Sequence, residues 1–536
     1  MEYDYIVTGA GAAGCVLASR LSEDAKVTVL LLEAGGRDRH PLFHMPAGFA
    51  RMTKGIASWG WSTVPQAQLG GRVLWFTQGK VLGGGTTINA QIYTRGNPGD
   101  YDAWANEAGC TGWSYREILP YFKRSEDNDR FANEYHGYGG PLGVSVPVNP
   151  LPINEAFLRA GQEYGIPYNP DFNGAHQAGL GHYQLTVRRA RRSSTAAAFI
   201  KPVLGRPNLT VRTQATATRI LVEKGRAVGV ELAGREIVRC RREVVVSSGA
   251  IGSPRLLLLS GIGPADHLRS VGVTVVHDLA GVGGNLQDHL DLYVICECTG
   301  DHTYDNYAKW HRAIPAGLQY LLYRQGPVAS TLFETGGFWF SGAASARPDI
   351  QFHLGLGSGI EAGVAQLKNP GVTLNSAYLR PRSRGTVRLA SADPAAMPLI
   401  DPSYWAEPED RRAALAGLKM AREIMRQKAL QPFVLAERQP GPEITSDETL
   451  AEFAFRTCKT DHHPVGTCKM GTDAASVVTP DLELRGLEGL RVCDSSVMPL
   501  IPSCNTNAPT IMVAEKAADL IRRRAAPPPA REAAAL

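Results

Sequence analysis

The N-terminal segment shows apolar runs separated by glycine and polar residues. Residues 5–8 form a short apolar run, which is typical of a buried parallel strand. Val16, Leu17 and Leu21 then recur at helical spacing, and residues 26–32 form a second apolar run. This order predicts a complete strand–helix–strand unit at the start of the chain.

Two kinds of apolar pattern occur later in the chain. The first matches the N-terminal unit and predicts strands at residues 209–212, 218–223, 227–231, 242–247 and 490–494. The second consists of alternating or short apolar runs and predicts an antiparallel sheet from residues 291–299, 349–355, 372–379 and 385–389, with a hairpin turn at 378–385. Helical patterns begin at residues 256–259 and cover 411–425 and 510–523. The fold class is therefore α/β (α+β overall), a Rossmann-like unit combined with a large antiparallel sheet.

The glycine-rich segment at residues 9–14 (GAGAAG) separates the first strand from the helix. Gly9 permits a tight turn, Gly11 lets the backbone approach a pyrophosphate, and Gly14 lets the helix pack closely on the strand. The helix N-terminus offers free N–H groups and partial positive charge to phosphates. Glu33 lies 19 residues beyond Gly14, where an acid accepts hydrogen bonds from ribose hydroxyls and disfavours NADP. This context predicts a dinucleotide site, with FAD and NAD equally open.

Composition narrows the class of protein only slightly. The 536 residues are 44% hydrophobic and 20% charged with a net charge of +5, which is ordinary globular composition and gives no argument for nucleic acid or an anionic membrane. No apolar stretch reaches the ~18 residues of a membrane span, so we expect no transmembrane segment and leave peripheral membrane contact open. We expect no secretory leader, and the nine scattered cysteines indicate reduced thiols of a cytoplasmic protein.

Three shorter segments have simple interpretations. Cys296 and Cys298 lie in an alternating run, so we interpret them as same-face residues of a strand and predict no metal site. The basic run at residues 188–192 is interpreted as a solvated face or loop. Three consecutive glycines at residues 83–85 indicate a loop pressed against a flat or charged ligand.

Longer motifs carry a family resemblance along almost the full chain. Residues 79–102, 249–263 and 281–289 resemble signature blocks of the glucose–methanol–choline (GMC) family of FAD-dependent oxidoreductases. Within that family the chain is most similar to the bacterial choline-dehydrogenase and L-sorbose-dehydrogenase branch. The resemblance implies a discontinuous FAD-binding domain (1–150, 200–295 and 465–525) and a substrate-binding domain (151–199 and 296–464). We expect residues 526–536 to be a disordered tail.

The resemblance also implies which positions contact FAD. These positions are Gly9, Gly11, Gly14, Glu33, Val81, Gly85, Asn89, Ala217, Gly249, Asp494 and Asn507. Some relatives attach the flavin covalently through a histidine, but the matching residue here is Ile88, which has no nucleophile. We therefore expect FAD without a covalent link.

Oxidation of an alcohol requires a group that takes the hydroxyl proton and a hydride acceptor. His463 lies in a segment that resembles the catalytic block of the family, and Asn505 occupies the position where the family uses histidine or asparagine. Because asparagine does not take up a proton, His463 is expected to be the base and Asn505 to bind the substrate oxygen. We interpret His462 as a packing residue and His289 as a non-catalytic loop residue near the cofactor.

The expected function is oxidation of a primary alcohol, polyol or sorbose-like sugar, with a quinone or another carrier as electron acceptor. Alternatives are an oxygen-using oxidase of aryl, furan or pyridoxine-type alcohols, an NAD-dependent dehydrogenase, and a non-catalytic flavoprotein. Choline also suits the resemblance, although a choline site needs an acid and aromatic rings that the pattern does not place.

Overall fold

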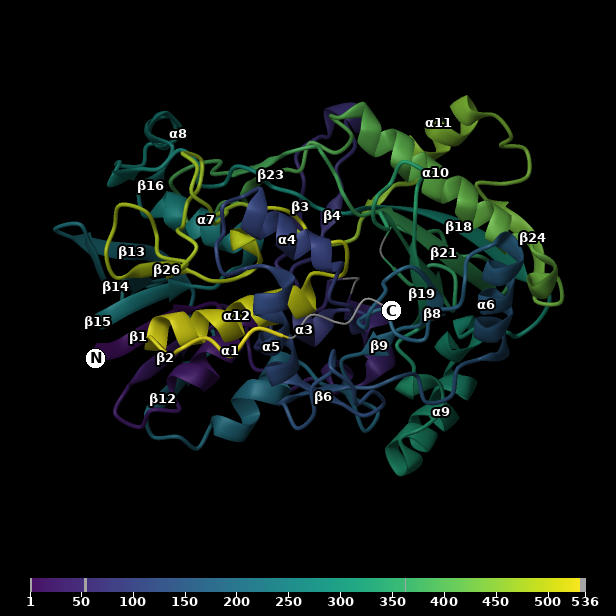
Figure 1. Ribbon diagram of the computed structural model, residues 1–536, viewed down its shortest axis with the longest axis horizontal. Helices are drawn as coiled ribbons and strands as arrows, with labels where there is room; N and C mark the ends of the chain where they lie inside the picture. Colours follow the sequence, from purple (N-terminus) through teal and green to yellow (C-terminus); the bar gives the residue numbers. More distant parts are fainter. Residues whose placement is uncertain (1, 53–54, 362, 531–536) are drawn as a thin grey trace.

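The computed structural model describes residues 2–52, 55–361 and 363–530 (Figure 1). Two large sheets lie at opposite ends of the long axis, and helices pack around and between them. The helices are α1 (Ala12–Leu21), α2 (Phe49–Met52), α3 (Gly85–Ile88), α4 (Pro98–Asn106), α5 (Tyr115–Ser125), α6 (Pro152–Tyr164), α7 (Gly249–Leu259), α8 (Ala265–Ser270), α9 (Trp310–Tyr323), α10 (Pro408–Met425), α11 (Asp447–Thr457) and α12 (Asn507–Arg522). Within the described ranges, none of them combines the length and apolar content needed to cross a bilayer.

The first sheet contains the predicted strand–helix–strand unit. Its order is β12-β2-β1-β15-β14-β13, with β26 also paired to β15. The pairs among β12, β2, β1, β15 and β26 are parallel, whereas β14 is antiparallel to both neighbours. The strands are β1 (Glu2–Thr8), β2 (Val29–Leu32), β12 (Leu209–Arg212), β13 (Ala217–Glu223), β14 (Arg226–Leu232), β15 (Ile237–Val246) and β26 (Leu490–Val492). The Rossmann-like prediction is confirmed, and α12 packs beside α1 against this sheet.

The second sheet is antiparallel throughout, as predicted. Its order is β24-β18-β21-β20-β19-β8, with β25 paired to β18, and α10 packs on β18 and β21. The strands are β8 (Gly179–His182), β18 (Leu290–Cys298), β19 (Phe333–Trp339), β20 (Ile350–Gly355), β21 (Gly371–Tyr378), β24 (Val434–Gln439) and β25 (Lys459–Thr460). Cys296 and Cys298 are buried in β18, in agreement with the strand interpretation.

The predicted hairpin at residues 378–385 is wrong. The strand that follows, β22 (Thr386–Arg388), pairs with β23 (Leu399–Asp401) and not with β21. The backbone N–H groups of Arg382 and Ser383 donate to the carboxylate of Asp410 at 2.8 and 2.9 Å. These bonds draw the chain away from β21 toward the start of α10.

Helix α7 begins at Gly249, earlier than the predicted start near residue 256. Pro254 lies inside it, and a proline has no N–H for the carbonyl four residues earlier, which is that of Ala250. The hydroxyl of Thr467 donates to this carbonyl at 2.5 Å. A side chain from a distant segment thus stabilises a helix that contains an internal proline. Two other helices also differ from the prediction. Residues 85–88, expected in a loop, form the single turn α3, and α12 begins at Asn507, three residues before the predicted start.

The domain boundaries stay a prediction. The boundary at residue 295 falls inside β18, which begins at Leu290. Residues 524–530 have no regular structure, but the N–H and carbonyl of Ala530 hydrogen-bond with Arg116 at 3.0 and 2.7 Å. The rest of the expected tail, 531–536, lies outside the described residues.

Candidate active site

A cavity of about 310 Å³ runs from the first glycine loop to the second sheet. One end is lined by Gly9, Gly11 and Glu33, and the other by His463 and Asn505. Residues predicted for cofactor binding and for catalysis therefore share one continuous space. The other predicted positions along its wall are Gly85, Asn89, Ala217, Gly249, Asp494 and Asn507.

Gly14 and Val81 do not line this cavity. A Cβ on Gly14 would lie 1.9 Å from the carbonyl oxygen of Gly9, so Gly14 permits the close approach of α1 to the loop. The Val81 side chain is buried in a small apolar cluster with Phe43, Met52 and Ile88. Both residues therefore support the residues that line the cavity without lining it themselves.

Glu33 directly follows β2 and is buried, 5% exposed. Its two carboxylate oxygens accept hydrogen bonds from the N–H groups of Ala10 (3.0 Å) and Gly35 (2.7 Å). Burial raises the pKa of Glu33 to about 7 despite these bonds. The carboxylate thereby ties the glycine loop to the end of β2 and still faces the cavity.

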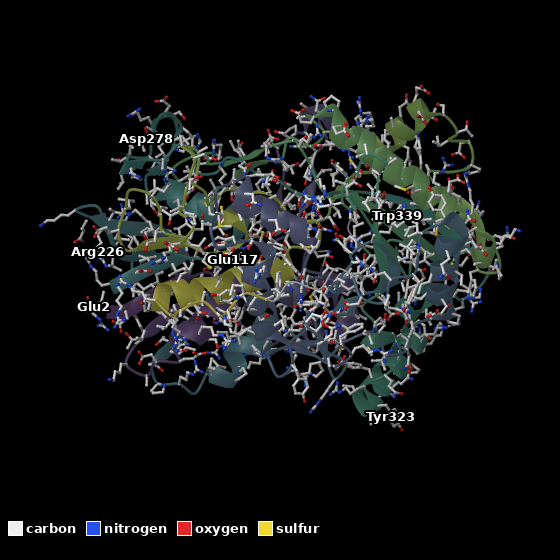
Figure 2. The ribbon with its side chains drawn as sticks, viewed as in Figure 1. Glu2, Glu117, Arg226, Asp278, Tyr323 and Trp339 are labelled. Atoms are coloured by element: carbon white, nitrogen blue, oxygen red, sulfur yellow. The ribbon has the colours of Figure 1, made fainter. Side chains whose placement is uncertain are left out.

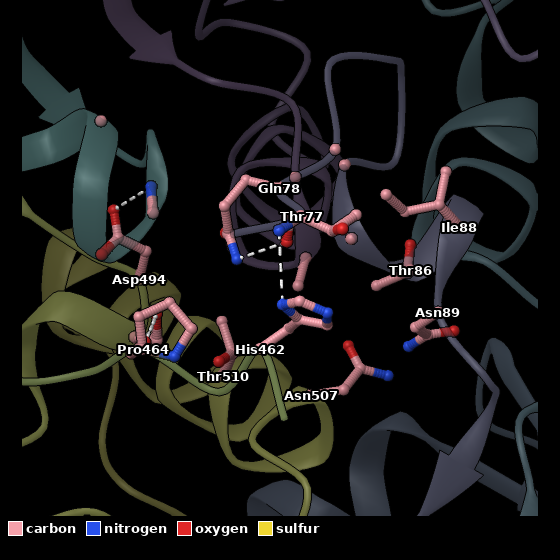
Figure 3. Close-up of a pocket in the computed structure, with 18 of the residues that line it drawn as sticks. Thr77, Gln78, Thr86, Ile88, Asn89, His462, Pro464, Asp494, Asn507 and Thr510 are labelled. Carbon is pink, nitrogen blue, oxygen red and sulfur yellow. Dashed lines mark hydrogen bonds between the residues drawn. The ribbon is translucent and has the colours of Figure 1, made fainter. Parts of the chain in front are cut away.

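Asp494 and Asn507 approach the cavity from the C-terminal segment (Figure 3). Asp494 accepts hydrogen bonds from the N–H of Gly249 (2.9 Å) and the hydroxyl of Ser253 (2.5 Å), which fixes the start of α7. Asn507 is the first residue of α12, and Thr506 and Thr510 also line the wall. The positive end of the α12 dipole therefore faces the cavity.

Arg192 is the main residue that the interpretation of the basic run missed. Arg188 and Arg191 are exposed as expected, but Arg192 is only 3% exposed and donates to the carbonyl oxygens of Thr86 (3.2 Å) and Asn89 (2.7 Å) and to the side-chain oxygen of Asn89 (2.8 Å). Its Nε and second Nη have no partner among the described residues. Burial lowers its pKa to about 9, and the prediction of a solvated run is wrong for this position.

His463 is held in one tautomer by a second histidine. The fully buried His289 donates from Nε2 to the carbonyl of Leu379 at 3.1 Å, since a carbonyl only accepts. Burial lowers the pKa of His289 to about 3, so the ring is neutral and its Nδ1 is an acceptor. That Nδ1 lies 3.0 Å from Nδ1 of His463, which must therefore carry the proton. We assign the free lone pair of His463 to Nε2 on this hydrogen-bond network.

Asn505 faces that lone pair. Its side-chain oxygen accepts from the hydroxyl of Thr94 (3.1 Å) and the amide of Gln351 (3.0 Å). The Nδ2 group is thus directed at His463 Nε2, 3.2 Å away. One of its two hydrogens points to His463, and the other is available to an oxygen atom of a bound molecule.

The loop that carries His463 is anchored by Asp288. The carboxylate accepts from the N–H of His463 (2.7 Å), the hydroxyl of Thr460 (2.5 Å) and the hydroxyl of Tyr404. Burial, and then the neighbouring His289, lower the pKa of His463 well below its ordinary value. The imidazole is therefore neutral near pH 7, as a general base requires.

His462 both packs and lines the cavity. Its ring meets Phe76 edge-on at 6.2 Å, and its Nδ1 accepts from the N–H of Thr77 at 3.3 Å (Figure 3). Burial lowers its pKa to about 4, so the ring is neutral and carries its proton on Nε2. The predicted packing role agrees with these contacts.

The end of the cavity near His463 combines aromatic and polar side chains that sequence reasoning did not single out. They are Phe49, Trp59, Trp61, Phe333, His353, Glu361 and Asn375. His353 and Asn375 are register partners on β20 and β21, in strands that are otherwise largely apolar. Polar residues within these apolar runs were the sequence signal that could have identified His353 and Asn375 as site residues.

His289, Asp461 and His463 bring atoms of the kind that bind metals within 4.8 Å of one another, but the two histidine Nδ1 atoms already bond to each other.

The cavity fits a dinucleotide. A Cβ on Gly11, Gly85 or Gly249 would meet no protein atom within 4 Å, although all three residues line the cavity. The absence of side chains at these positions therefore leaves room for a ligand along the wall. The N-terminus of α1, where Gly11 and Ala12 line the cavity, adds partial positive charge that suits a pyrophosphate.

Comparisons with known proteins identify the family of this chain. Two family models described as GMC oxidoreductase match residues 3–291 and 381–514. The alcohol dehydrogenase [acceptor] of Pseudomonas putida is 43% identical over 533 residues, which cover 97% of this chain and 96% of that protein. The mitochondrial choline dehydrogenase of Mus musculus is 41% identical over 97% of this chain and 89% of its own length.

Solved structures show the same fold. Pyridoxine 4-oxidase from Mesorbium loti superposes with a TM-score of 0.88 at 30% identity, over 98% of this chain and 100% of its own. A formate oxidase of Aspergillus oryzae, in a study of FAD modification, reaches 0.92 at 26% identity over 97% and 98%. FAD is therefore the cofactor, and the NAD alternative is set aside. The chain belongs to the GMC oxidoreductase family and is an FAD-dependent enzyme that acts on CH–OH donors.

Proposed function

We propose that the enzyme oxidises a primary alcohol, a polyol or a sorbose-like sugar to the aldehyde or ketone, with His463 as the base. The observation that carries this proposal is the Nε2 lone pair of His463, directed at Asn505 at the end of a cavity suited to a dinucleotide. Bound FAD supplies the hydride acceptor.

The protein groups divide the remaining work. On binding, the substrate hydroxyl replaces Asn505 as the hydrogen-bond donor to His463 Nε2 and accepts a hydrogen bond from Asn505 Nδ2. As the C–H hydride leaves, the O–H proton moves to Nε2 and the C–O bond becomes a carbonyl. His463 is then an imidazolium, whose Nδ1–H still donates to His289. Asp461 Oδ2 lies 3.2 Å from the same Nδ1, and burial raises the pKa of this carboxyl well above its ordinary value.

The substrate end favours an uncharged, hydroxyl-rich molecule. Glu361 faces the cavity, but its carboxylate already binds Lys459 at 3.1 Å and Asn375 at 2.9 Å. Lys459 and Asn375 balance the negative charge of Glu361. The polar atoms of Glu361 and Asn375 that face the cavity can hydrogen-bond to the hydroxyl groups of a polyol. Choline is the second candidate, because Glu361 shares the cavity with Trp61 and Phe333, which could face a quaternary ammonium.

We propose a quinone or another carrier as electron acceptor and oxygen as the alternative. The first assignment is supported by the similarity to the alcohol dehydrogenase [acceptor], and the second by the similarity to pyridoxine 4-oxidase. We also propose that FAD is bound without a covalent link. Ile88 is buried among apolar side chains and has no nucleophile. Acid precipitation should then release intact FAD, whereas yellow colour in the pellet would contradict this assignment.

An alcohol panel tests the proposed function. Under anaerobic conditions, flavin absorbance should bleach with polyols or primary alcohols, and choline should be slower. Bleaching with choline alone would overturn the preferred substrate class, and no bleaching with any alcohol would overturn the function. The same substrates in air test the acceptor, because an oxidase forms hydrogen peroxide at the rate of turnover and a dehydrogenase does not.

A further inference from the structure

Helix α9 leaves an apolar surface uncovered. Of the eighteen large hydrophobic side chains that are exposed in the described chain, six lie on this one 14-residue helix. They are Trp310 (76% exposed), Ile314 (58%), Leu318 (54%), Leu321 (57%), Leu322 (71%) and Tyr323 (69%). The helix projects from the lower side of the molecule, and Tyr323 lies at its tip (Figures 1 and 2).

The apolar residues form a stripe with helical spacing. Trp310, Ile314, Leu318 and Leu321 follow one another at intervals of three or four residues and so share a face. On the opposite side only Ala316 and Tyr320 are buried. The helix is thus anchored by a narrow contact, and most of its apolar surface faces away from the core.

Basic residues lie at both ends of this helix and in the turn beside it, whereas Arg312 within the helix pairs with Asp301. Its own sequence contains no Asp or Glu, and the exposed Lys309 and Arg324 lie at its two ends. The Tyr320 hydroxyl donates to the carbonyl of Ala190 at 2.9 Å. This bond places the turn of a basic hairpin, formed by β10 (Val187–Arg188) and β11 (Arg191–Arg192), against α9. Within the described ranges, Lys309, Arg324, Arg189 and Arg191 form no ion pair with a carboxylate.

We propose that α9 docks the enzyme on an anionic lipid bilayer, lying in the plane of the interface. At about 21 Å the helix is too short to span the ~30 Å apolar layer. An apolar face, flanking cations and aromatic residues at both ends are the features of an interfacial helix. The acidic headgroups complement the cations that α9 and the hairpin expose.

A second copy of the chain fits this surface less well. A two-fold contact would place the same patch of each copy against itself and bring like charges together. The bilayer instead offers an apolar layer beneath a layer of negative charge. Helix α9 is also close to the active site in sequence. The next strand, β19, begins at Phe333, which lines the cavity.

Vesicle binding by the FAD-loaded enzyme tests this proposal. The probes are vesicles of phosphatidylcholine alone and of equal phosphatidylcholine and phosphatidylglycerol. Flotation should show binding to the anionic vesicles, weakened by salt. Trp310→Gln, Leu318→Gln and Leu322→Gln combined should lower the partition coefficient at least about ten-fold. Arg189→Gln, Arg191→Gln and Lys309→Gln combined should lower it by about five-fold per removed charge.

Two controls separate docking from general surface effects. Val148→Gln, Ile237→Gln and Leu435→Gln combined, at positions that are 60%, 50% and 60% exposed, should bind as the wild type does. Brominated lipids should quench tryptophan fluorescence in the wild type and less in Trp310→Phe. All variants should keep wild-type activity with a water-soluble dye. Absence of binding, equal loss in the control, or an α9 variant that only changes a dimer to a monomer would overturn the proposal.

Discussion

The Nδ1 atoms of His289 and His463 lie 3.0 Å apart, and this contact determines where His463 carries its proton. Because His289 donates from its other nitrogen to the Leu379 carbonyl, it accepts from His463. The lone pair of His463 is therefore on the nitrogen that faces Asn505. We infer that His289 positions His463; it lies in the loop directly before β18, as expected.

Replacement of His289 tests this positioning. His289→Phe removes the acceptor, so the His463 ring is free to change tautomer and orientation, and anaerobic flavin reduction should slow by about 10²-fold. His289→Asn can return an acceptor oxygen near the Nδ1 position and should recover much of the rate. FAD absorbance should be unchanged in both. Equal rates in His289→Phe and the wild type would show that the contact does not position the base.

The pH dependence of flavin reduction follows from the lowered pKa of His463. The neutral ring is the active base, and a pKa below the ordinary ~6.5 keeps it neutral to lower pH. The rate constant should stay level as pH falls to 6.5 and decrease only below it. Stopped-flow measurements across pH 5–9 check this expectation; a decrease that begins above pH 7 would contradict the lowered pKa.

Asn505→Ala should have a milder effect than loss of the base. It removes one hydrogen bond to the substrate oxygen, which predicts about a ten-fold slower reduction. The FAD content, measured by absorbance of the purified protein, should be that of the wild type. Complete loss of flavin would instead identify Asn505 as a structural residue.

Arg192 and Arg191 form a matched pair for the cofactor cradle. Arg192 is buried and holds Asn89, whereas Arg191 is exposed. Arg192→Met should weaken FAD rebinding to the apoenzyme at least about ten-fold, because Asn89 loses a charge-assisted bond. Arg191→Met should leave the FAD dissociation constant unchanged. The same dissociation constant in both variants would exclude a role for Arg192 in the cradle.

The local parts of the fold could be predicted because their signals are local. The strand–turn–helix order around Gly9 and the acid at Glu33 lie within one short segment, and the structure has them as expected. The alternating runs likewise predicted β18, β20 and β21. In each case the pattern of the segment and its tertiary environment favour the same element.

The errors occur where a distant residue overrides local preference. Gly249 and Pro254 indicate a break in the chain, yet Thr467 supplies the hydrogen bond that keeps α7 intact. The sequence after β21 is typical of a hairpin turn. In the structure, the Asp410 carboxylate accepts hydrogen bonds from the N–H groups of this segment and directs it elsewhere. Neither partner is visible in the segment itself.

The sequence located two candidate site residues but few of the residues around them. His463 and Asn505 lie in recognisable blocks, and the structure brings them together. Arg192 belongs to a run of basic residues that look alike in the sequence. Only the tertiary structure shows that Arg192 is buried. His353 and Asn375 reach the cavity because β20 and β21 pair in one register, which the sequence does not specify.

We propose that His463 takes the hydroxyl proton of the substrate. The most direct test is stopped-flow reduction of the flavin in His463→Ala, with the exposed His176→Ala as control. We predict FAD bound in both, wild-type reduction in His176→Ala, and a 10²–10⁴-fold slower rate in His463→Ala. Flavin bleaching at wild-type speed in His463→Ala would contradict the account.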